Sequence, residues 1–428
     1  QQTLRSMVTS SLRFGKSARV ALLLLVGISL LASTAAIDAP GGKPSSKPKK
    51  QTLGNYAKLF LRPSKSEADI DAYAFVIPGK IGWAAKTSFY FGLWYFFNIF
   101  YNVANKKALN ALNLPWMQSL ACVGVGTPYI GLLWLLGIQA APKLTSTQFN
   151  ALAPSIACHS AGNVGGNIAF GSGALGFAHV LKSMEPAFTA IFSGVITGKW
   201  KSLYEYAALL PIMGGVAYAS ASELNFNMLQ FVSAMVSNVG FSLRSVWSKE
   251  IMSWDRSVTK MDGPNTFRVL QVGSTLLTIP FVLAVEGWRA LFPWTHPNWK
   301  AAIGKLDHAG QMITPAYLWS QIILSGLAFQ LYYEASYLAL DAVTPITYSV
   351  GNNIKRIVIV ITSVIVFGQK MNTQSIIGSG IALGGVFAYS MISDYFANQA
   401  KIAASAKSGG KTLRKPAAAT PPPPPPPV

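Results

Sequence analysis

Ten long apolar segments constrain the fold of this 428-residue chain more than any other feature of its sequence. Each is long enough to cross ~30 Å of hydrocarbon as a helix. A helix satisfies its own backbone hydrogen bonds, so a chain with many such segments forms a helical bundle in lipid. We therefore expect an all-α polytopic membrane protein with ten transmembrane helices, at 87–105, 115–137, 149–170, 173–197, 203–221, 226–246, 265–286, 317–339, 342–367 and 374–393.

The composition agrees with this class, since 51% of the residues are hydrophobic and only 12% are charged. The net charge of +20 comes mostly from the two ends, residues 1–83 and 394–428. Basic ends are typical of targeting segments and of contacts with anionic lipid headgroups, so we do not assign this charge to nucleic-acid binding. Cys122 and Cys158 both lie in apolar segments, which excludes a disulfide framework and a cysteine-rich metal site.

The two ends have the composition of processing or tail segments. Residues 1–36 run from a basic start through a short apolar block to small residues, which is the order of a signal peptide. Residues 37–83 are rich in Lys, Ser and Pro, which is typical of a transit peptide. This two-part order resembles the leader of proteins in plastids of secondary origin. Residues 397–428 are mainly Lys, Ala and Pro, and we expect them to be disordered.

An internal repeat divides the body of the chain into two halves. Residues 193–199 match 363–370, and residues 211–218 match 381–389, at an offset of about 170 residues. This predicts two five-helix repeats, 84–223 and 224–396. An odd number of spans in each repeat places the halves in opposite membrane orientations, as in many transporters.

Two adjacent cations, Lys355 and Arg356, stand between two runs that carry no charge, Ala342–Asn353 and Ile357–Gly368. A cation at mid-bilayer costs ~2.5–3.5 kcal/mol on insertion scales, so such a pair indicates a site for an anion. The alternatives are snorkelling from a helix end and pairing with an acid on another helix. Long apolar runs on both sides argue against snorkelling.

A third cation, Lys182, lies at a nearly equivalent position in the first repeat. Lys182, shifted by the repeat offset, falls at Asn352, one turn before Lys355. Inverted repeats bind substrate at their interface, and three converging cations suit a dianionic phosphate. The alternative for Lys182 is an ion pair with Glu185, three residues later. We expect the like charges to repel one another in the empty site, so that occlusion becomes favourable only with phosphate bound and exchange is obligatory.

Arg244 lies well inside the sixth segment. It either lines the cavity or pairs with an acid on another helix, the candidates being Glu286, Glu334 and Asp341. Tyr332 and Tyr333 could offer a hydroxyl to substrate, although packing is the commoner role for either one alone.

The histidines His159 and His179 are expected in the core with a backbone partner rather than as proton relays. The sequence contains no phosphate-binding glycine loop in P-loop spacing, no paired carboxylates and no His-x-x-x-His metal spacing. We therefore predict neither an enzyme nor a bound metal or cofactor.

The chain resembles the plastid phosphate translocators of the triose-phosphate/phosphate family, within the drug/metabolite transporter superfamily, from residue 87 to about residue 393. The stretches that carry the resemblance are Trp94–Asn98 with Asn105-Lys106-Lys107, His179-x-x-Lys182-x-x-Glu185-Pro186, Ser242–Arg244 with Ser248-Lys249, and Pro345–Thr347 with Asn352-x-x-Lys355-Arg356. The resemblance implies one-for-one exchange of inorganic phosphate for a phosphorylated C3, C5 or C6 compound. It also implies that Lys182, Lys355 and Arg356 bind the phosphate, with Arg244 and Tyr332 close by.

The motifs of the resemblance point to different subtypes. Asn163, four residues after His159, stands where triose-phosphate members carry a histidine, as in phosphoenolpyruvate-type members, and Gly166 lacks their small hydroxyl. Residues 367–374 resemble the triose-phosphate type, and residues 185–188 resemble the hexose- and pentose-phosphate types.

We expect phosphate exchange for triose phosphate, 3-phosphoglycerate or phosphoenolpyruvate across a plastid membrane, by a monomer or homodimer. His159 and Asn163 join Arg244 and Tyr332 as supporting residues. A hexose- or pentose-phosphate exchanger, and a nucleotide-sugar or drug exporter of the same superfamily, remain alternatives.

Overall fold

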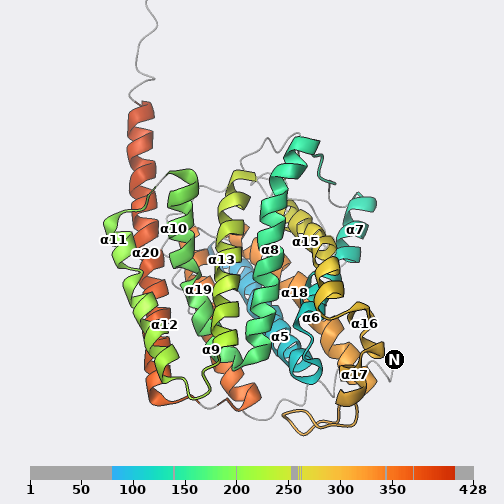
Figure 1. Cartoon of the computed structure of the whole chain (residues 1–428). Coiled ribbons are helices and arrows are strands. Elements are labelled where there is room, and N and C mark those ends of the chain that lie inside the picture. Colours follow the sequence, from blue (N-terminus) through green and yellow to red (C-terminus); the bar gives the residue numbers. More distant parts are fainter. Residues whose placement is uncertain are drawn as a thin grey trace, which may run out of the picture.

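All ten expected segments are helical in the computed structural model, which describes residues 80–409 except 138–139, 199, 252–258, 260, 262, 343–344 and 370 (Figure 1). The signal peptide and most of the transit-peptide-like leader lie outside the described residues. The helices of the bundle are α5 (Lys80–Leu112), α6 (Pro115–Gly124), α7 (Thr127–Leu135), α8 (Ser146–Ser172), α9 (Leu175–Leu181), the 3₁₀ turn η1 (Lys182–Met184), α10 (Glu185–Thr197), α11 (Leu203–Ala207), α12 (Leu210–Ser222), α13 (Met228–Ile251), α15 (Gly263–Val285), α18 (Pro315–Ala342), α19 (Pro345–Phe367) and α20 (Thr373–Gly409).

Three of the expected segments are broken into shorter helices, and a proline begins each new piece. Pro128 lies in the first turn of α7, Pro186 in that of α10 and Pro211 in that of α12. Proline has no N–H to donate and clashes with the preceding turn, so it starts a helix more readily than it continues one. Interrupted helices in membrane proteins are tolerated where the freed backbone lines a cavity, and the break at η1 lies at Lys182.

Three helical stretches in the described part of the chain are apolar enough on composition alone to cross a membrane, Pro115–Leu135, Asn265–Val285 and Thr373–Ser393. Other helices contain polar residues that face the interior of the bundle. In α8, for example, Asn163 and Asn167 are both buried. A helix that lines an interior site can carry such residues, because its polar side chains find partners there instead of facing lipid.

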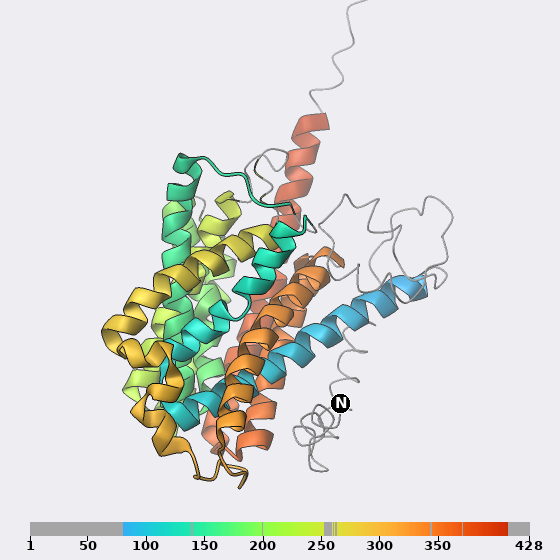
Figure 2. The same ribbon diagram turned by 90° about the vertical axis from the view of Figure 1, so that its right-hand side faces the viewer.

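The repeats pack against each other through equivalent pairs of helices. The most extensive contacts are α8 with α13 and α5 with α18, and each pair joins the first helix of one repeat to the third helix of the other. The pair α8 and α13 runs antiparallel, since Ser155 approaches Ser248 and Ala169 approaches Gln230. Figure 2 shows α5 and α18 crossing the molecule beside this pair. The interior between the two pairs therefore belongs to both repeats.

Gly378 and Gly385, the second of which belongs to the repeated Gly-Gly motif, explain how α12 contacts α20. A methyl group on Gly378 would lie 2.6 Å from the backbone N of Ala219, and one on Gly385 would lie 2.9 Å from the N of Ile212. Only glycine permits this approach of the two backbones. The two helices run antiparallel, as an inverted arrangement of equivalent fifth helices requires.

The second repeated motif ends two equivalent helices. Gly198 follows α10 with φ +68°, and Gly368 follows α19 with φ +60°. Both glycines occupy the left-handed conformation that commonly ends a helix and that other residues adopt only with strain.

Two predicted boundaries differ from the structure. The tail expected to begin at residue 397 is helical as far as Gly409, because α20 continues through an Ala- and Lys-rich stretch that favours helix. Residues 410–428 lie outside the described residues. At the other end, α5 begins at Lys80, inside the range assigned to the leader.

The polar connection between α15 and α18 folds at one end of the bundle (Figure 2). It contains α16 (Trp288–Leu291), a 3₁₀ turn at Pro293–Thr295 and α17 (Pro297–Ala302). An antiparallel bridge then pairs Leu306 with Met312. Trp299 and Ala302 pack with residues of α5 and α18, so this connection covers the ends of both helices.

Candidate functional site

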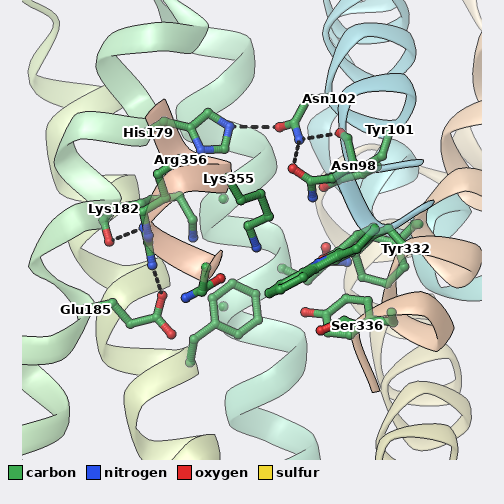
Figure 3. A pocket seen from close by; sticks show the side chains of 18 of the residues that line it. Asn98, Tyr101, Asn102, His179, Lys182, Glu185, Tyr332, Ser336, Lys355 and Arg356 are labelled. Carbon is green, nitrogen blue, oxygen red and sulfur yellow. Dashed lines mark hydrogen bonds and ion pairs between the residues drawn. The ribbon is translucent and has the colours of Figure 1, made fainter. Parts of the chain in front are cut away.

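A cavity of about 320 Å³ lies between the two repeats, surrounded by α5, α8, α9 with η1, the start of α10, α13, α18 and α19 (Figure 3). Its walls combine aromatic rings, amides and charged groups, the polar ones being Asn98, Asn102, Asn163, His179, Lys182, Glu185, Arg244, Ser245, Ser336, Asn352, Lys355 and Arg356. The cavity thus contains the three cations that the sequence singled out.

The cations reach the cavity from both repeats. Lys182 lies at η1 in the first repeat, while Lys355 and Arg356 lie on α19 in the second. Lys182 and Arg356 are each only 9% exposed. Charges this deeply buried are held only where partners or a bound ion compensate them.

Arg356 has an acidic partner, Glu185, which comes from the other repeat. The Nη2 atom of Arg356 lies 2.9 Å from Oε2 of Glu185, and Nη1 donates to the carbonyl oxygen of Lys182 at 2.7 Å. The alternative weighed for the adjacent cations, pairing with an acid on another helix, is therefore realised for Arg356. The alternative weighed for Lys182, an ion pair with Glu185, is not realised. The described residues show no Lys182–Glu185 ion pair within 4.0 Å.

Lys182 is positioned by a hydroxyl and a ring. Its Nζ donates to Oγ of Ser237 at 2.6 Å and lies 4.6 Å from the ring centre of Phe241. Ser237 in turn donates to the carbonyl oxygen of Gly162 at 2.7 Å. The hydroxyl therefore acts as an acceptor for the lysine and leaves the ammonium with further N–H groups to donate.

Lys355 contacts aromatic faces. Its Nζ lies 5.0 Å from the ring centre of Trp94 and 5.9 Å from that of Tyr332. Trp94 is itself stacked on Tyr348 at 4.9 Å with the planes 6° apart. Rings attract the ammonium without accepting its protons, so Lys355 keeps its donors for a ligand in the cavity.

Arg244 lines the cavity, and His159 lies behind it. The Nη1 atom of Arg244 lies 3.0 Å from Nδ1 of His159, whose side chain is fully buried and does not line the cavity. Two of the proposed acidic partners are engaged elsewhere, since Glu334 pairs with Arg268 at 2.8 Å and Glu286 accepts from the backbone of α6. The side chain of Asp341 lies outside the described residues.

Tyr332 and Asn163 line the cavity and are also held by their neighbours. Tyr332 packs against the rings of Tyr101 and Phe329 at 5.5 and 5.4 Å. Asn163 donates from Nδ2 to the carbonyl oxygen of Ser119 at 2.9 Å. Both residues are therefore fixed before any ligand arrives.

The expectation that both histidines have backbone partners was wrong. His159 contacts Arg244, and His179 lies 2.8 Å from Oδ1 of Asn102 while lining the cavity beside the cations. The sequence did contain a signal for His179. It precedes Lys182 by three residues, as Lys182 precedes Glu185, and that spacing places side chains on one side of a helix.

A network of buried amides continues from the cavity residue Asn163, which accepts hydrogen bonds from Asn167. Asn105 donates to Asn167 at 2.7 Å, and Gln118 donates to Asn105 at 2.9 Å and to Ser325 at 2.7 Å. Next to Asn105, Nζ of Lys106 donates to two carbonyl oxygens where α8 finishes. These groups bridge both repeats, so separating the helices here requires several buried hydrogen bonds to break together.

The described residues contain no cluster of three or more His, Cys, Asp or Glu side chains that could hold a metal ion. The cavity wall combines arginine and lysine donors with aromatic and amide groups, and such donors are suited to an anion.

Comparison with known proteins places the chain among transporters. The model of the Triose-phosphate Transporter family matches residues 85–390. The chain is 34% identical over 305 residues to the glucose-6-phosphate/phosphate translocator 1, chloroplastic, of Arabidopsis thaliana, covering 71% of this chain and 74% of that protein. It is 33% identical over 314 residues to the phosphoenolpyruvate/phosphate translocator 1, chloroplastic, of the same plant, covering 73% of each chain.

A third relative is named for a C3 substrate. The triose phosphate/phosphate translocator, chloroplastic, of Pisum sativum is 33% identical over 323 residues, and the match covers 76% of each chain. Since the family model covers more than half of the chain and these relatives are at least 33% identical over more than 70% of it, this chain belongs to the Triose-phosphate Transporter family and is a transporter, not an enzyme.

Proposed function

We propose that this protein is an antiporter that exchanges inorganic phosphate for a phosphorylated C3 compound across a plastid membrane by alternating access. One observation carries the proposal: Lys182, Lys355 and Arg356, from two repeats, converge on a single buried cavity. The names of the relatives support it, because each is called a phosphate translocator and is labelled chloroplastic.

The charges of the cavity favour binding of a dianion. Lys182, Lys355 and Arg356 supply three positive charges, and Glu185 removes one. These four groups therefore leave two positive charges for a phosphate that carries two negative ones. Arg244 adds a further positive charge at the cavity wall.

The ion pair between Glu185 and Arg356 changes which charges repel one another in the empty site, and this repulsion is the expected reason for obligatory exchange. Glu185 compensates Arg356 in the empty site, so the uncompensated repulsion is between Lys182 and Lys355. Closing the cavity around these two ammonium groups is unfavourable without an anion, because burial disfavours the charged form of each. Bound phosphate offsets both charges, so the loaded carrier reorients and the empty one does not.

The size of the cavity supports a C3 substrate. Its volume of about 320 Å³ is near the lower end of the ~300–1,000 Å³ range of small-molecule pockets. Triose phosphate, 3-phosphoglycerate and phosphoenolpyruvate are the small members of the substrate class. Some relatives are named for glucose 6-phosphate and xylulose 5-phosphate, so a hexose- or pentose-phosphate exchanger is the second candidate.

The test is counter-exchange of labelled phosphate in proteoliposomes loaded with phosphate, triose phosphate, 3-phosphoglycerate, phosphoenolpyruvate or glucose 6-phosphate. We expect exchange with phosphate and the C3 compounds and none in empty vesicles. Lys355→Ala and Arg356→Ala should each abolish exchange with every internal substrate. Lys305→Ala, which removes an exposed lysine of the polar connection, is the matched control and should exchange like the wild type. Retained exchange in both cavity variants would exclude this site.

We further propose that the leader directs the protein to a plastid of secondary origin. Residues 1–83 fused to a fluorescent protein should then enter such a plastid, and residues 37–83 alone should not leave the cytosol of its host cell. Entry without residues 1–36 would instead favour a one-step leader.

A further inference from the structure

We propose that His179 recognises the protonated oxygen of inorganic phosphate, and so distinguishes HPO₄²⁻ from sulfate, a dianion whose four oxygens all share its charge. The inference rests on the proposed function, because it concerns the same cavity. It assigns a neutral hydrogen-bond acceptor to a cavity wall whose charged groups, apart from Glu185, are all donors.

The hydrogen bonds of two asparagines fix which nitrogen of His179 carries the proton. Nδ2 of Asn102 donates to the carbonyl oxygen of Asn98 at 2.8 Å, and a carbonyl can only accept. The other end of that amide is therefore its oxygen, Oδ1, which lies 2.8 Å from Nε2 of His179. Since Oδ1 can only accept, Nε2 must carry the proton.

The neighbouring charges keep the imidazole neutral. Lys182, Lys355 and Arg356 line the same cavity as His179, and nearby cations disfavour a further positive charge. A neutral imidazole with its proton on Nε2 has a lone pair on Nδ1. The described residues show no hydrogen bond to this second nitrogen.

The ring is held so that Nδ1 faces the cation cluster. His179 stacks on Phe170 with ring centres 5.2 Å apart and planes at 22°. Together with the bond to Asn102, this stack fixes both the plane and the direction of the ring. Figure 3 shows the second ring nitrogen turned toward Arg356 and Lys182. Glu185 is the charged acceptor of the cavity wall, and it already pairs with Arg356.

An acceptor at this point separates ligands by their protons. Inorganic phosphate carries at least one P–OH group at neutral pH, and that group can donate to Nδ1. Sulfate offers only unprotonated oxygens, which the lone pair repels. A buried acceptor left without its donor weakens binding by roughly tenfold to a hundredfold. For a phosphate ester, the oxygen that Nδ1 repels least is the bridging one, since it carries the least charge.

The experiment measures the ratio of phosphate to sulfate uptake into phosphate-loaded proteoliposomes. The wild type should prefer phosphate by at least tenfold. Asn102→Leu removes the group that holds the proton on Nε2, so the imidazole can turn its proton toward the ligand. Its ratio should fall by about tenfold or more, because sulfate uptake rises while phosphate uptake declines.

Two further variants distinguish a loss of ligand recognition from misfolding. His179→Phe keeps an aromatic ring on Phe170 and removes the acceptor, and its ratio should also approach one. Asn298→Leu removes an asparagine that donates to the carbonyl oxygen of Leu112 outside the cavity, and its ratio should equal that of the wild type. A purely structural role of Asn102 or His179 would lower both uptakes together and leave the ratio unchanged.

The tautomer can be measured without transport. The chain has four histidines, so nitrogen NMR of ¹⁵N-histidine-labelled protein can assign His179 by comparison with His179→Phe. We expect an unprotonated Nδ1 in the wild type, perturbed on addition of phosphate but not of sulfate. Absence of phosphate exchange in the wild type would remove the proposed function. Normal phosphate exchange with no preference over sulfate, or with a preference that both variants retain, would remove this inference alone.

Discussion

Arg356 and Glu185 form an ion pair of 2.9 Å across a separation of 171 residues, and the pair joins the two repeats inside the cavity. The carboxylate occupies one side of the guanidinium that we assign to phosphate. Arg356 is therefore partly compensated before a ligand arrives, and the phosphate must share this arginine with Glu185 or displace it.

Glu185→Gln should tighten phosphate binding and slow exchange. The substitution removes a negative charge that repels the incoming dianion, so the KM for phosphate should fall about threefold to tenfold. Release should become slower for the same reason, and the maximal rate should fall by a similar factor. Phosphate counter-exchange kinetics measure both. Glu223→Gln, at a carboxylate that accepts from Ser375 away from the cavity, is the control. A higher KM would show instead that Glu185 mainly positions Arg356.

His159→Leu should weaken phosphate binding through Arg244. Nδ1 of His159 accepts from the guanidinium at 3.0 Å, and losing such a bond costs ~0.5–1.5 kcal/mol. We expect the KM for phosphate to rise by roughly threefold to tenfold, with a smaller change in the maximal rate. His159→Gln restores an acceptor and should recover most of the affinity. A lower melting temperature without any change in KM would contradict a positioning role.

Gly378→Ala should destabilise the contact between α12 and α20. Its added methyl group would lie 2.6 Å from the backbone N of Ala219, and overpacking of this kind costs ~1–3 kcal/mol. We expect a lower melting temperature in detergent, followed by tryptophan fluorescence.

The neighbouring glycines provide the matched comparison for that contact. A methyl group on Gly384 or Gly214 would meet nothing within 4 Å. Gly384→Ala and Gly214→Ala should therefore leave the melting temperature unchanged or raise it, because alanine favours helix over glycine by ~0.5–1 kcal/mol. Equal losses in all three variants would mean that helix propensity, and not the close approach, decides the effect.

Asp307 should contribute stability that is lost in acid. Burial raises the pKa of this carboxyl, but its other interactions outweigh burial and hold the pKa below its usual value of about 3.9. These are hydrogen bonds from the backbone of Gln311 and Ala309 and from the Tyr317 hydroxyl, and the charge of Lys107, whose Nζ lies 3.9 Å away.

Because the folded pKa is depressed, the contribution of Asp307 is complete above about pH 4 to 5 and disappears as pH falls through the folded pKa. Asp307→Asn should therefore melt at a lower temperature than the wild type at neutral pH, and the difference should shrink as pH falls through the folded pKa. A difference in melting temperature that does not change with pH would assign the effect to packing around the Leu306–Met312 bridge.

Sequence alone determined the features that depend on one segment at a time. Apolar length located the helical segments of the described residues, because a membrane requires long runs of apolar residues. The repeated glycines at 215 and 385 and at 198 and 368 indicated the two halves. Lys355 and Arg356 stood out because charges are rare between such runs.

Only the tertiary structure decided which groups meet. The partner of Arg356 comes from 171 residues away, and the amide that orients His179 comes from 77 residues away. No local pattern encodes these pairs, since each depends on how helices far apart in the sequence cross and on the direction of their side chains. The sequence therefore named the cations, while the packing of the helices decided which of them remain uncompensated in the cavity.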